Sequence, residues 1–194
     1  MLLLATRNEH KVEEIRRFVP EGVKIVTLKD LCIKAEAEED GETFTENAVK
    51  KAMFYARKAN LPTIADDSGL VIDALNGFPG VHSARFMPKA SYEEKMRFIL
   101  KMLEGKTDRT ARFVCAAAYY DPVGKLLVCT EGIVEGHISE EIRGKYGFGY
   151  DPIFIPEGFA QTFGELGQEK HNVSHRYRAF SKLFSLLNDI ILAK

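Results

Sequence analysis

The stretch Leu61-Pro62-Thr63-Ile64-Ala65-Asp66-Asp67-Ser68-Gly69-Leu70-Val71-Ile72 sets two adjacent carboxylates between apolar segments. Its ends predict strand pieces at Ile64–Asp66 and Leu70–Asp73, which flank an acidic turn. An unpaired buried carboxylate costs several kcal/mol, so the two aspartates cannot both point into a dry core. We expect a divalent cation, a basic ligand partner or open water at a strand end to compensate them. An exposed Asx turn is the alternative.

The elements on both sides of this stretch alternate between strand and helix. Before it, the pattern predicts a strand at Leu2–Ala5, a helix from Val12 to Pro20, a strand at Val23–Leu28, and a helix capped by Thr43 and Glu46 that ends near Asn60. After it come a helix capped by Ser91 and Glu94, β-prone runs at Ala111–Tyr120 and Lys125–Val134, and a last helix from about Ser174 to Leu192. The turn at residues 121–124 joins the two runs into an antiparallel hairpin. We therefore predict an α/β fold with a mixed, partly antiparallel central sheet flanked by helices.

The composition narrows the class of protein. The 194 residues are 45% hydrophobic, which suits one globular domain. Lys and Arg number 27 against 28 Asp and Glu, and this balance argues against a dedicated duplex nucleic-acid binder. Cys32, Cys115 and Cys129 form no C-x-x-C pair, so we expect buried thiols in a reducing cytoplasm and neither disulfides nor a zinc site. No run resembles a signal peptide or a membrane span.

The first of four polar clusters is Thr6-Arg7-Asn8-Glu9-His10-Lys11, between the first strand and the first helix. A helix N-terminus offers free N–H groups and partial positive charge, so phosphate can bind there. Thr6 and Asn8 can add hydrogen bonds, and Lys11 can reach a phosphate oxygen. In the alternative, Thr6 or Asn8 only caps the helix and Lys11 is solvated.

The second cluster joins Asp66 and Asp67 to the acidic segment Glu36–Glu42, which has too many like charges to pack. Paired carboxylates suit Mg²⁺, which prefers oxygen ligands and contacts substrate phosphates. Glu38 can complete such a site, and a water activated there can attack phosphorus. A solvated acidic loop is the alternative.

The third cluster, Gly144–Pro152, holds three glycines and three aromatic residues. Its backbone can approach a ligand closely while Phe148 or Tyr150 stacks on a planar ring. Pro152 predicts an extended Asp151 that presents its carboxylate. A glycine-rich turn with packed aromatic rings is the alternative.

The fourth cluster, Lys170-His171 followed by Ser174–Arg178, is the most basic stretch of the chain and begins the last helix. Its side chains can bind phosphate or donate to the oxygen edge of a base. The alternative is a solvated helix start.

Together, and in this order, these segments resemble the inosine/xanthosine triphosphate pyrophosphatases, which hydrolyse non-canonical purine nucleotides. The matching segments extend over nearly the whole chain, from residue 2 to about 185: Ala5–Lys11, Glu46-Asn47-Ala48 with Lys51-Ala52, Ala65–Leu70, Gly77–Arg85, Gly147–Pro152 and Ser174-His175-Arg176. The resemblance implies a single nucleotide pyrophosphatase domain over residues 1–194, two lobes with an active-site cleft between them, and a homodimer.

The resemblance also implies roles for individual residues. By this resemblance, the triphosphate would be bound by Lys51 and by the first turn, Thr6, Arg7, Asn8, Glu9, His10 and Lys11. Glu38 and Asp67 would bind Mg²⁺, and Asp67 would also act as the general base. Asp66 would support it, and Ser68 would contact the substrate. Two assignments stay open: Glu39 is the alternative to Glu38, and metal ligation and base function are not separated between Asp66 and Asp67.

Base binding is implied for the remaining residues. The loop of Phe148, Gly149, Tyr150 and Asp151 would hold the base, with Phe148 stacked on the purine. Lys170, His175 and Arg176 would read the base and help to close the site. Donors that expect a 6-oxo group would be left unpaired by adenine, and such mismatches reach roughly 10⁴-fold discrimination.

The implied reaction is Mg²⁺-dependent hydrolysis of ITP, dITP and XTP to the nucleoside monophosphate and pyrophosphate. Small-molecule nucleotides are then the partners, with no stable nucleic-acid partner and no membrane. A pyrophosphatase for modified pyrimidine nucleotides would share the metal chemistry, but the 148–151 loop and Ser174-His175-Arg176 disfavour it. A non-catalytic nucleotide sensor would not need the paired carboxylates.

Overall fold

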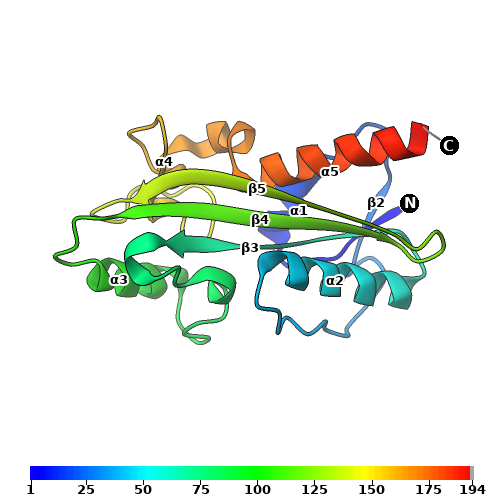
Figure 1. Cartoon of the computed structure of the whole chain (residues 1–194), viewed down its shortest axis with the longest axis horizontal. Helices are drawn as coiled ribbons and strands as arrows, with labels where there is room; N and C mark the ends of the chain where they lie inside the picture. Colours follow the sequence, from blue (N-terminus) through cyan, green and yellow to red (C-terminus); the bar gives the residue numbers. More distant parts are fainter. Residues whose placement is uncertain (193–194) are drawn as a thin grey trace. The chain divides into compact units, whose positions relative to one another are not determined.

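The computed structural model describes residues 1–192, with side chains through residue 189. Strands and helices alternate through the first half of the chain, and a long hairpin and a terminal helix dominate the second half (Figure 1). The strands are β1 (Leu2–Leu4), β2 (Ile25–Thr27), β3 (Thr63–Ile72), β4 (Thr110–Asp121), β5 (Leu126–Ile138) and β6 (Phe154–Pro156). The helices are α1 (Glu9–Arg16), α2 (Phe44–Ala59), α3 (Tyr92–Met102), α4 (Phe163–Leu166) and α5 (His175–Leu192).

The strands form one mixed sheet in the order β2-β1-β3-β4-β5-β6. Strand β1 is parallel to β2, with Leu3 opposite Val26, and parallel to β3, with Leu3 opposite Thr63. Strand β6 is antiparallel to β5. Strands β4 and β5 are neighbours joined by only four residues, a connection that antiparallel strands alone allow. The predicted α/β class and mixed sheet are confirmed.

The predicted caps of α2 and α3 are also confirmed, whereas α1 begins at Glu9 and ends at Arg16 and not at the predicted Pro20. Thr43 and Glu46 form a capping box at the start of α2, and Ser91 and Glu94 form another at the start of α3. Helix α2 ends at Asn60, whose φ of 50° is the left-handed conformation that commonly terminates helices.

The chain divides into two compact units, and the division falls within β3, β4 and β5. The first unit contains Met1–Asp67, Cys115–Gly132 and the helix from His175 onwards. The second contains Ser68–Val114 and Ile133–Ser174.

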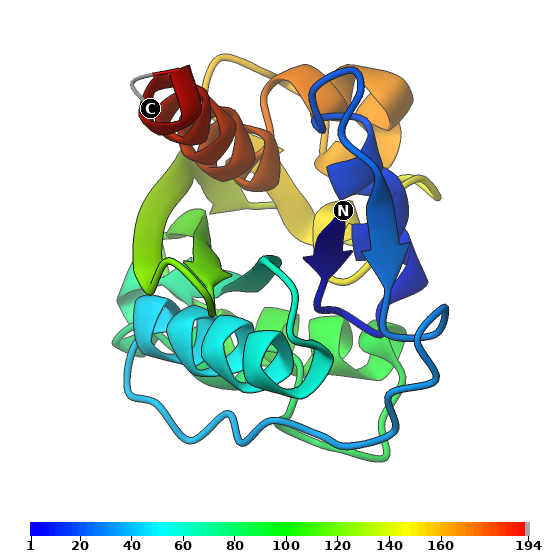
Figure 2. The same ribbon diagram turned by 90° about the vertical axis from the view of Figure 1, so that its right-hand side faces the viewer.

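In the first unit, apolar side chains pack on both faces of the strands. One cluster joins Leu2, Leu4 and Ile64 to α1 and α5, whereas the other joins Leu3, Ala5 and Ala65 to α2. Figures 1 and 2 show α2 and α5 on opposite sides of these strands. Because successive strand residues point to opposite faces, each strand residue belongs to either the α5 face or the α2 face.

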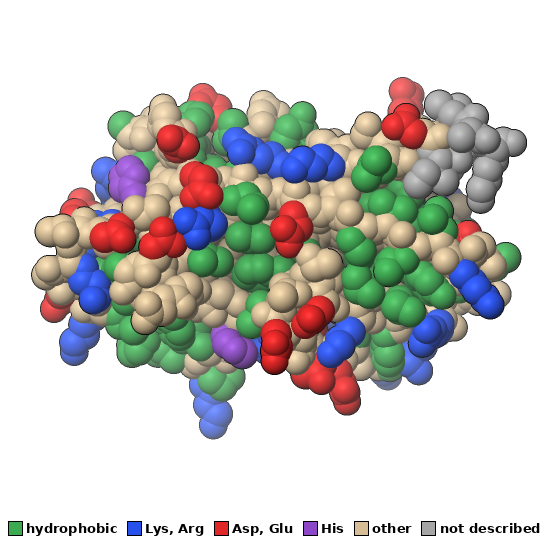
Figure 3. All heavy atoms as spheres, in the orientation of Figure 1, with side chains coloured by type: hydrophobic (Ala, Val, Ile, Leu, Met, Phe, Trp, Pro, Cys, Tyr) green, Lys and Arg blue, Asp and Glu red, His purple; other side chains and the backbone are tan. Residues whose placement is uncertain are grey.

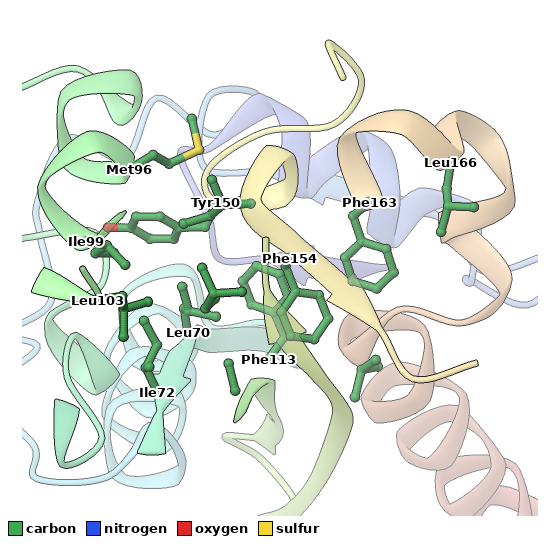
Figure 4. Close-up of a cluster of buried hydrophobic side chains, with 14 residues drawn as sticks. Leu70, Ile72, Met96, Ile99, Leu103, Phe113, Tyr150, Phe154, Phe163 and Leu166 are labelled. Atoms are coloured by element: carbon green, nitrogen blue, oxygen red, sulfur yellow. The ribbon is translucent and has the colours of Figure 1, made fainter. Parts of the chain in front are cut away.

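The second unit has one core, drawn in Figure 4. Leu70 and Ile72 of β3, Ile99 of α3, Leu103 just after α3, and the rings of Phe113, Phe154 and Phe163 are buried together. The Phe113 and Phe154 ring centroids are 4.6 Å apart. This core supports the loop that precedes β6.

The surface agrees with the balanced composition. On the face drawn in Figure 3, acidic and basic side chains are interspersed with apolar ones. No helix within residues 1–192 is long and apolar enough to cross a membrane. The prediction of buried thiols is correct for Cys115 but wrong for Cys32 and Cys129, which are exposed.

Candidate active site

Strand β3 runs without interruption through the predicted acidic turn, so that prediction is wrong. Both aspartates are buried, with Asp66 1% and Asp67 6% exposed. Asp66 lies on the α5 face, two residues after Ile64, and Asp67 lies on the α2 face, two residues after Ala65. The compensating charges are cations of the chain itself, one set on each face, and this is why the strand needs no turn here.

The Asp66 carboxylate lies among cations from two helices. Its Oδ2 is 2.9 Å from Lys11 Nζ of α1 and 3.3 Å from Arg176 Nε of α5. The Cys115 thiol donates to the same oxygen at 3.9 Å. Burial favours the neutral acid, but the charges of Lys11 and Arg176 outweigh it and hold the pKa of Asp66 well below its usual range. These two cations therefore favour the ionised form of Asp66.

Arg176 also donates through Nη1 to Glu14 Oε2, and the guanidinium is almost completely buried. Lys11, Arg176, Asp66 and Glu14 thus place two positive and two negative charges in the interior of the first unit. Removing one partner from such a group leaves a buried charge uncompensated. Lys11 and Arg176, predicted as phosphate and base contacts, meet at one carboxylate.

Asp67 has different surroundings on the α2 face. Its Oδ2 accepts a hydrogen bond of 3.0 Å from Asn47 Nδ2, and its Oδ1 is 4.0 Å from Lys51 Nζ. Burial raises the pKa of Asp67 more than Lys51 and Asn47 lower it, and the charge of Glu39 raises it further. The pKa values of these adjacent residues are therefore shifted in opposite directions. Asp66 is held in its ionised form, whereas Asp67 takes up a proton more readily than an ordinary aspartate.

The acidic loop approaches Asp67 through Gly41 and Glu39. The Gly41 N–H donates to Asn47 Oδ1 at 2.8 Å, and a Cβ at Gly41 would lie 2.7 Å from that oxygen, so only glycine fits. Glu39 Oε2 is 3.3 Å from Lys51 Nζ. Glu38, the residue predicted to bind metal, is exposed and forms no ion pair with a described residue. Of the two alternatives, Glu39 is thus the one whose carboxylate lies next to Lys51.

The oxygen donors of Asp67 and Glu39 suit a hard divalent cation. Both carboxylates lie against one ammonium, that of Lys51, so the structure already places positive charge between them. Within the described residues, no group of three His, Cys, Asp or Glu side chains is arranged as a complete metal site. This donor set fits Mg²⁺, which commonly uses one or two carboxylates together with water and substrate phosphates.

The first turn begins α1 as predicted, and Asn8 is its cap. Asn8 Oδ1 accepts from the N–H groups of His10 and Lys11, and Thr6 Oγ1 accepts from the Asn8 N–H. Arg7 Nη2 donates to the carbonyls of Ile33 and Ala35, at 3.0 and 2.9 Å, which ties the turn to the acidic loop. Glu9 and His10 are exposed. Asn8 therefore caps the helix, but Lys11 is not solvated as that alternative predicted, because its ammonium pairs with Asp66.

In the second unit, the Asp151 carboxylate does not extend outward as predicted. Asp151 begins a short 3-10 helix and is 2% exposed. Its Oδ2 accepts from the Phe148 N–H at 2.9 Å and from Lys170 Nζ at 2.7 Å. The prediction was wrong because Pro152 is tolerated in the first turn of a helix, where its missing N–H is not needed.

Lys170 connects this turn to an aromatic ring. Its Nζ lies 5.0 Å from the centroid of the Phe148 ring, and the residue is 2% exposed. Tyr150 is buried, and its hydroxyl donates to the Ser83 carbonyl. Of the two rings considered for stacking on a base, Phe148 is therefore the more accessible.

The remaining candidates divide between the units. Ser68 and Gly149 are partly buried residues of the second unit. His175 is a buried residue at the start of α5 in the first unit. Lys170 and Arg176, predicted to act on the same base, thus form separate buried ion pairs in different units.

Comparison with known proteins gives the family. The sequence model of the Ham1 family matches residues 2–186. The chain belongs to the Ham1 family. It is 45% identical to a dITP/XTP pyrophosphatase of Dictyoglomus thermophilum over 188 residues, which cover 94% of this chain and 92% of the relative. A dITP/XTP pyrophosphatase of Bacillus subtilis is also 45% identical, over 190 residues that cover 95% of this chain and 96% of the relative.

A solved structure supports the same family. The structure of a HAM1 protein from Coxiella burnetii matches this fold with a TM-score of 0.89 and 36% sequence identity, and the match covers 97% of this chain and 98% of the other. The predicted resemblance to the inosine/xanthosine triphosphate pyrophosphatases is confirmed at the level of the family. The Ham1 match includes every candidate residue of both units.

Sequence reasoning gave no role to two residues of this Ham1 site. Glu14 lies three residues after Lys11, a spacing that puts both on one face of α1 and that favoured a charged pair. Asn47 was part of a matching segment, and its position in the first turn of α2 gave no hint that it would contact Asp67.

We predict that the two aspartates affect stability in opposite ways. The folded-state pKa of Asp67 is raised, so its ionisation lowers the free energy of unfolding as pH rises from the ordinary carboxyl range. Asp67→Asn should therefore raise Tm at pH 7, and the gain should vanish below about pH 4, the pKa range of an unfolded Asp. Asp66→Asn leaves two buried cations short of an anion and should cost about 3–5 kcal/mol.

Thermal unfolding followed by circular dichroism between pH 4 and pH 8 measures both effects. The two variants are matched, since each replaces one neighbouring carboxylate by its amide. Equal destabilisation by both at pH 7 would contradict the difference between the two faces.

Proposed function

We propose that this chain hydrolyses non-canonical purine nucleoside triphosphates, such as dITP, ITP and XTP, to the nucleoside monophosphate and pyrophosphate. Support for the substrate class comes from relatives named dITP/XTP pyrophosphatases, at 45% identity over nearly the whole chain. Support for hydrolysis comes from Asp67, a buried carboxylate with a raised pKa beside the Lys51 ammonium. Such a carboxylate suits a general base better than an ordinary exposed one.

In the proposed step, Asp67 takes a proton from a water molecule. The water oxygen forms a bond to the α-phosphorus, and the bond from that phosphorus to the bridging oxygen breaks. Pyrophosphate leaves with the electron pair. The Asn47 hydrogen bond occupies Asp67 Oδ2 and fixes the carboxylate, which leaves Oδ1 to accept the proton. Asp66 is a weaker proton acceptor than Asp67, because the charges of Lys11 and Arg176 hold its pKa well below the usual range.

Lys11 and Lys51 are the proposed contacts of the triphosphate. Each ammonium faces a carboxylate of the first unit, Lys11 at 2.9 Å from Asp66 and Lys51 at 3.3 Å from Glu39. These ion pairs keep both side chains partly buried and oriented, and a polyanion offers each a stronger partner. The N-terminus of α1, capped by Asn8, adds partial positive charge beside Lys11.

Asp67 and Glu39 are the proposed ligands of Mg²⁺. When bound, the ion would neutralise phosphate charge and lower the pKa of a coordinated water. Glu39 would then exchange its contact with Lys51 for the ion, which releases the ammonium for the triphosphate. Glu38 remains the alternative ligand from the sequence.

Recognition of the base is proposed for the second unit. Phe148 presents a partly exposed ring, and the Lys170 ammonium behind it is held by Asp151 at 2.7 Å. The ammonium and the backbone N–H groups of the turn at residues 147–150 are the donors that a 6-oxo group would use. Adenine carries a donor at this position, so dATP would set its 6-amino group against donors of the protein and gain no hydrogen bond from them.

The first prediction from this proposal is a preference among substrates. Pyrophosphate release from dITP, ITP and XTP in the presence of Mg²⁺ should exceed release from dATP by at least about 100-fold in kcat/KM, because unpaired buried donors are costly. A coupled pyrophosphate assay measures all four, with Asp67→Asn as the inactive control. Equal rates on the four nucleotides would contradict the proposed specificity. Release of phosphate in place of pyrophosphate would contradict the proposed cleavage between the α-phosphorus and the bridging oxygen.

The second prediction separates Glu39 from Glu38. Removing a metal ligand weakens the binding of Mg²⁺. Glu39→Gln should therefore raise the Mg²⁺ concentration at half-maximal rate by about tenfold, equivalent to about 1.4 kcal/mol. Glu38→Gln, the matched control on an exposed neighbour, should leave that concentration within about twofold. Titrating Mg²⁺ at saturating dITP measures both. The reverse result would restore Glu38 as the ligand.

A further inference from the structure

Lys95 of α3 is a buried cation that has no part in the proposed reaction. The residue is 4% exposed, and among the described residues no carboxylate forms an ion pair with it. Its Nζ donates to the Ala84 carbonyl at 2.8 Å and lies 5.4 Å from the Phe86 ring centroid and 5.0 Å from that of Tyr92. A cation buried against a carbonyl and two aromatic rings needs those groups in one fixed arrangement.

The carbonyl that Lys95 holds belongs to a turn that also holds Tyr150. The Ser83 carbonyl, next to that of Ala84, accepts from the Tyr150 hydroxyl. The Ser83 side chain accepts from the Leu70 N–H at 2.9 Å and donates to the Gly80 carbonyl. The turn at Ser83 and Ala84 is therefore fixed from three directions, and Lys95 supplies the only charged contact among them.

The two rings that enclose Lys95 are also the rings that pack on Tyr150. Tyr92 meets the Tyr150 ring edge to face at a centroid distance of 5.2 Å, and Phe86 stacks on it at 6.4 Å. A Cβ at Gly149 would lie 3.7 Å from the Tyr92 ring. Figure 4 shows the Tyr150 ring extending from its loop toward α3, beside Met96 and Ile99. Lys95 thus contacts both of the rings, Phe86 and Tyr92, that pack on Tyr150 and so hold the loop at residues 147–150.

We infer that Lys95 is a positioning residue for base recognition: through Ala84, Phe86 and Tyr92 it fixes Tyr150, and with Tyr150 the loop that carries Phe148 and Gly149. The inference rests on the proposed function, because the loop matters to affinity only if it binds the base. It assigns Lys95 no contact with the substrate. Replacing Lys95 should therefore weaken binding of the nucleotide base and leave binding of the phosphates unchanged.

The test replaces Lys95 by Met, which keeps the apolar stem and removes the charge. Lys95→Met should raise KM for dITP by about tenfold with kcat within about twofold, since a loop that only binds the base affects binding alone. The inhibition constant of inorganic tripolyphosphate, a probe that has no base, should stay within about twofold. Lys101→Met, the same substitution at an exposed position of α3, is the matched control and should change neither value.

A second pair keeps the test decisive if Lys95→Met folds poorly. Tyr92 is 37% exposed, so Tyr92→Leu should fold and raise KM for dITP, whereas Tyr92→Phe keeps the ring and should not. An unchanged KM in Lys95→Met or Tyr92→Leu overturns the inference, as does a parallel rise of KM and of the tripolyphosphate constant, which shows general damage. A wild-type chain that releases no pyrophosphate from dITP overturns the proposed function itself.

Discussion

The alternation of side chains along β3 is the constraint on which the candidate site depends. Because adjacent strand residues point to opposite faces, Asp66 and Asp67 are only one residue apart and yet share no partner within hydrogen-bond or ion-pair distance. Asp66 meets two cations from α1 and α5, whereas Asp67 meets an amide and one more distant ammonium from α2. One aspartate stays ionised, and the other is disposed to accept a proton.

The buried charges explain why this strand can carry two carboxylates through the interior. Asp66 is compensated by Lys11 and Arg176, and Asp67 in part by Asn47 and Lys51. The buried guanidinium of Arg176 is shared between Asp66 and Glu14. Buried ion pairs add little net stability but are costly to break, so they fix α1 and α5 in position around the strand. The same pairs orient Lys11 and Lys51 before any ligand arrives. Preorganised cations of this kind bind a polyanion without first having to be ordered.

Much of the fold was predictable from local signals. Capping boxes at Thr43 and Ser91 and the hairpin at residues 121–124 have short-range causes, and the structure confirms them. Strand β6 and helix α4 escaped prediction, because three or four residues are too short to show a period. The uninterrupted β3 also escaped it, since the partners that neutralise Asp66 lie 55 and 110 residues away in sequence.

The order of motifs along the chain was enough to find the candidate residues. It did not show which residues surround them in the structure. Sequence indicated that Asp67, Lys11 and Lys170 matter without showing that Lys11 pairs with Asp66 or that Asp151 turns inward onto Lys170. It left Glu38 and Glu39 as alternatives, and only the structure shows that Glu39 lies near Lys51 while the Gly41 N–H donates to Asn47. Long-range pairing is what sequence patterns lack.

Strand β3 shifts the pKa values of the adjacent Asp66 and Asp67 in opposite directions. Carbon-13 NMR titration of the side-chain carboxyl groups, assigned with Asp66→Asn and Asp67→Asn, measures both pKa values. Asp67 should titrate above the ordinary pKa of about 3.9, and Asp66 should stay ionised to the acid limit of the folded protein. Two ordinary pKa values, or the reverse order, would show that the two faces of the strand do not separate the acidities of these carboxyl groups.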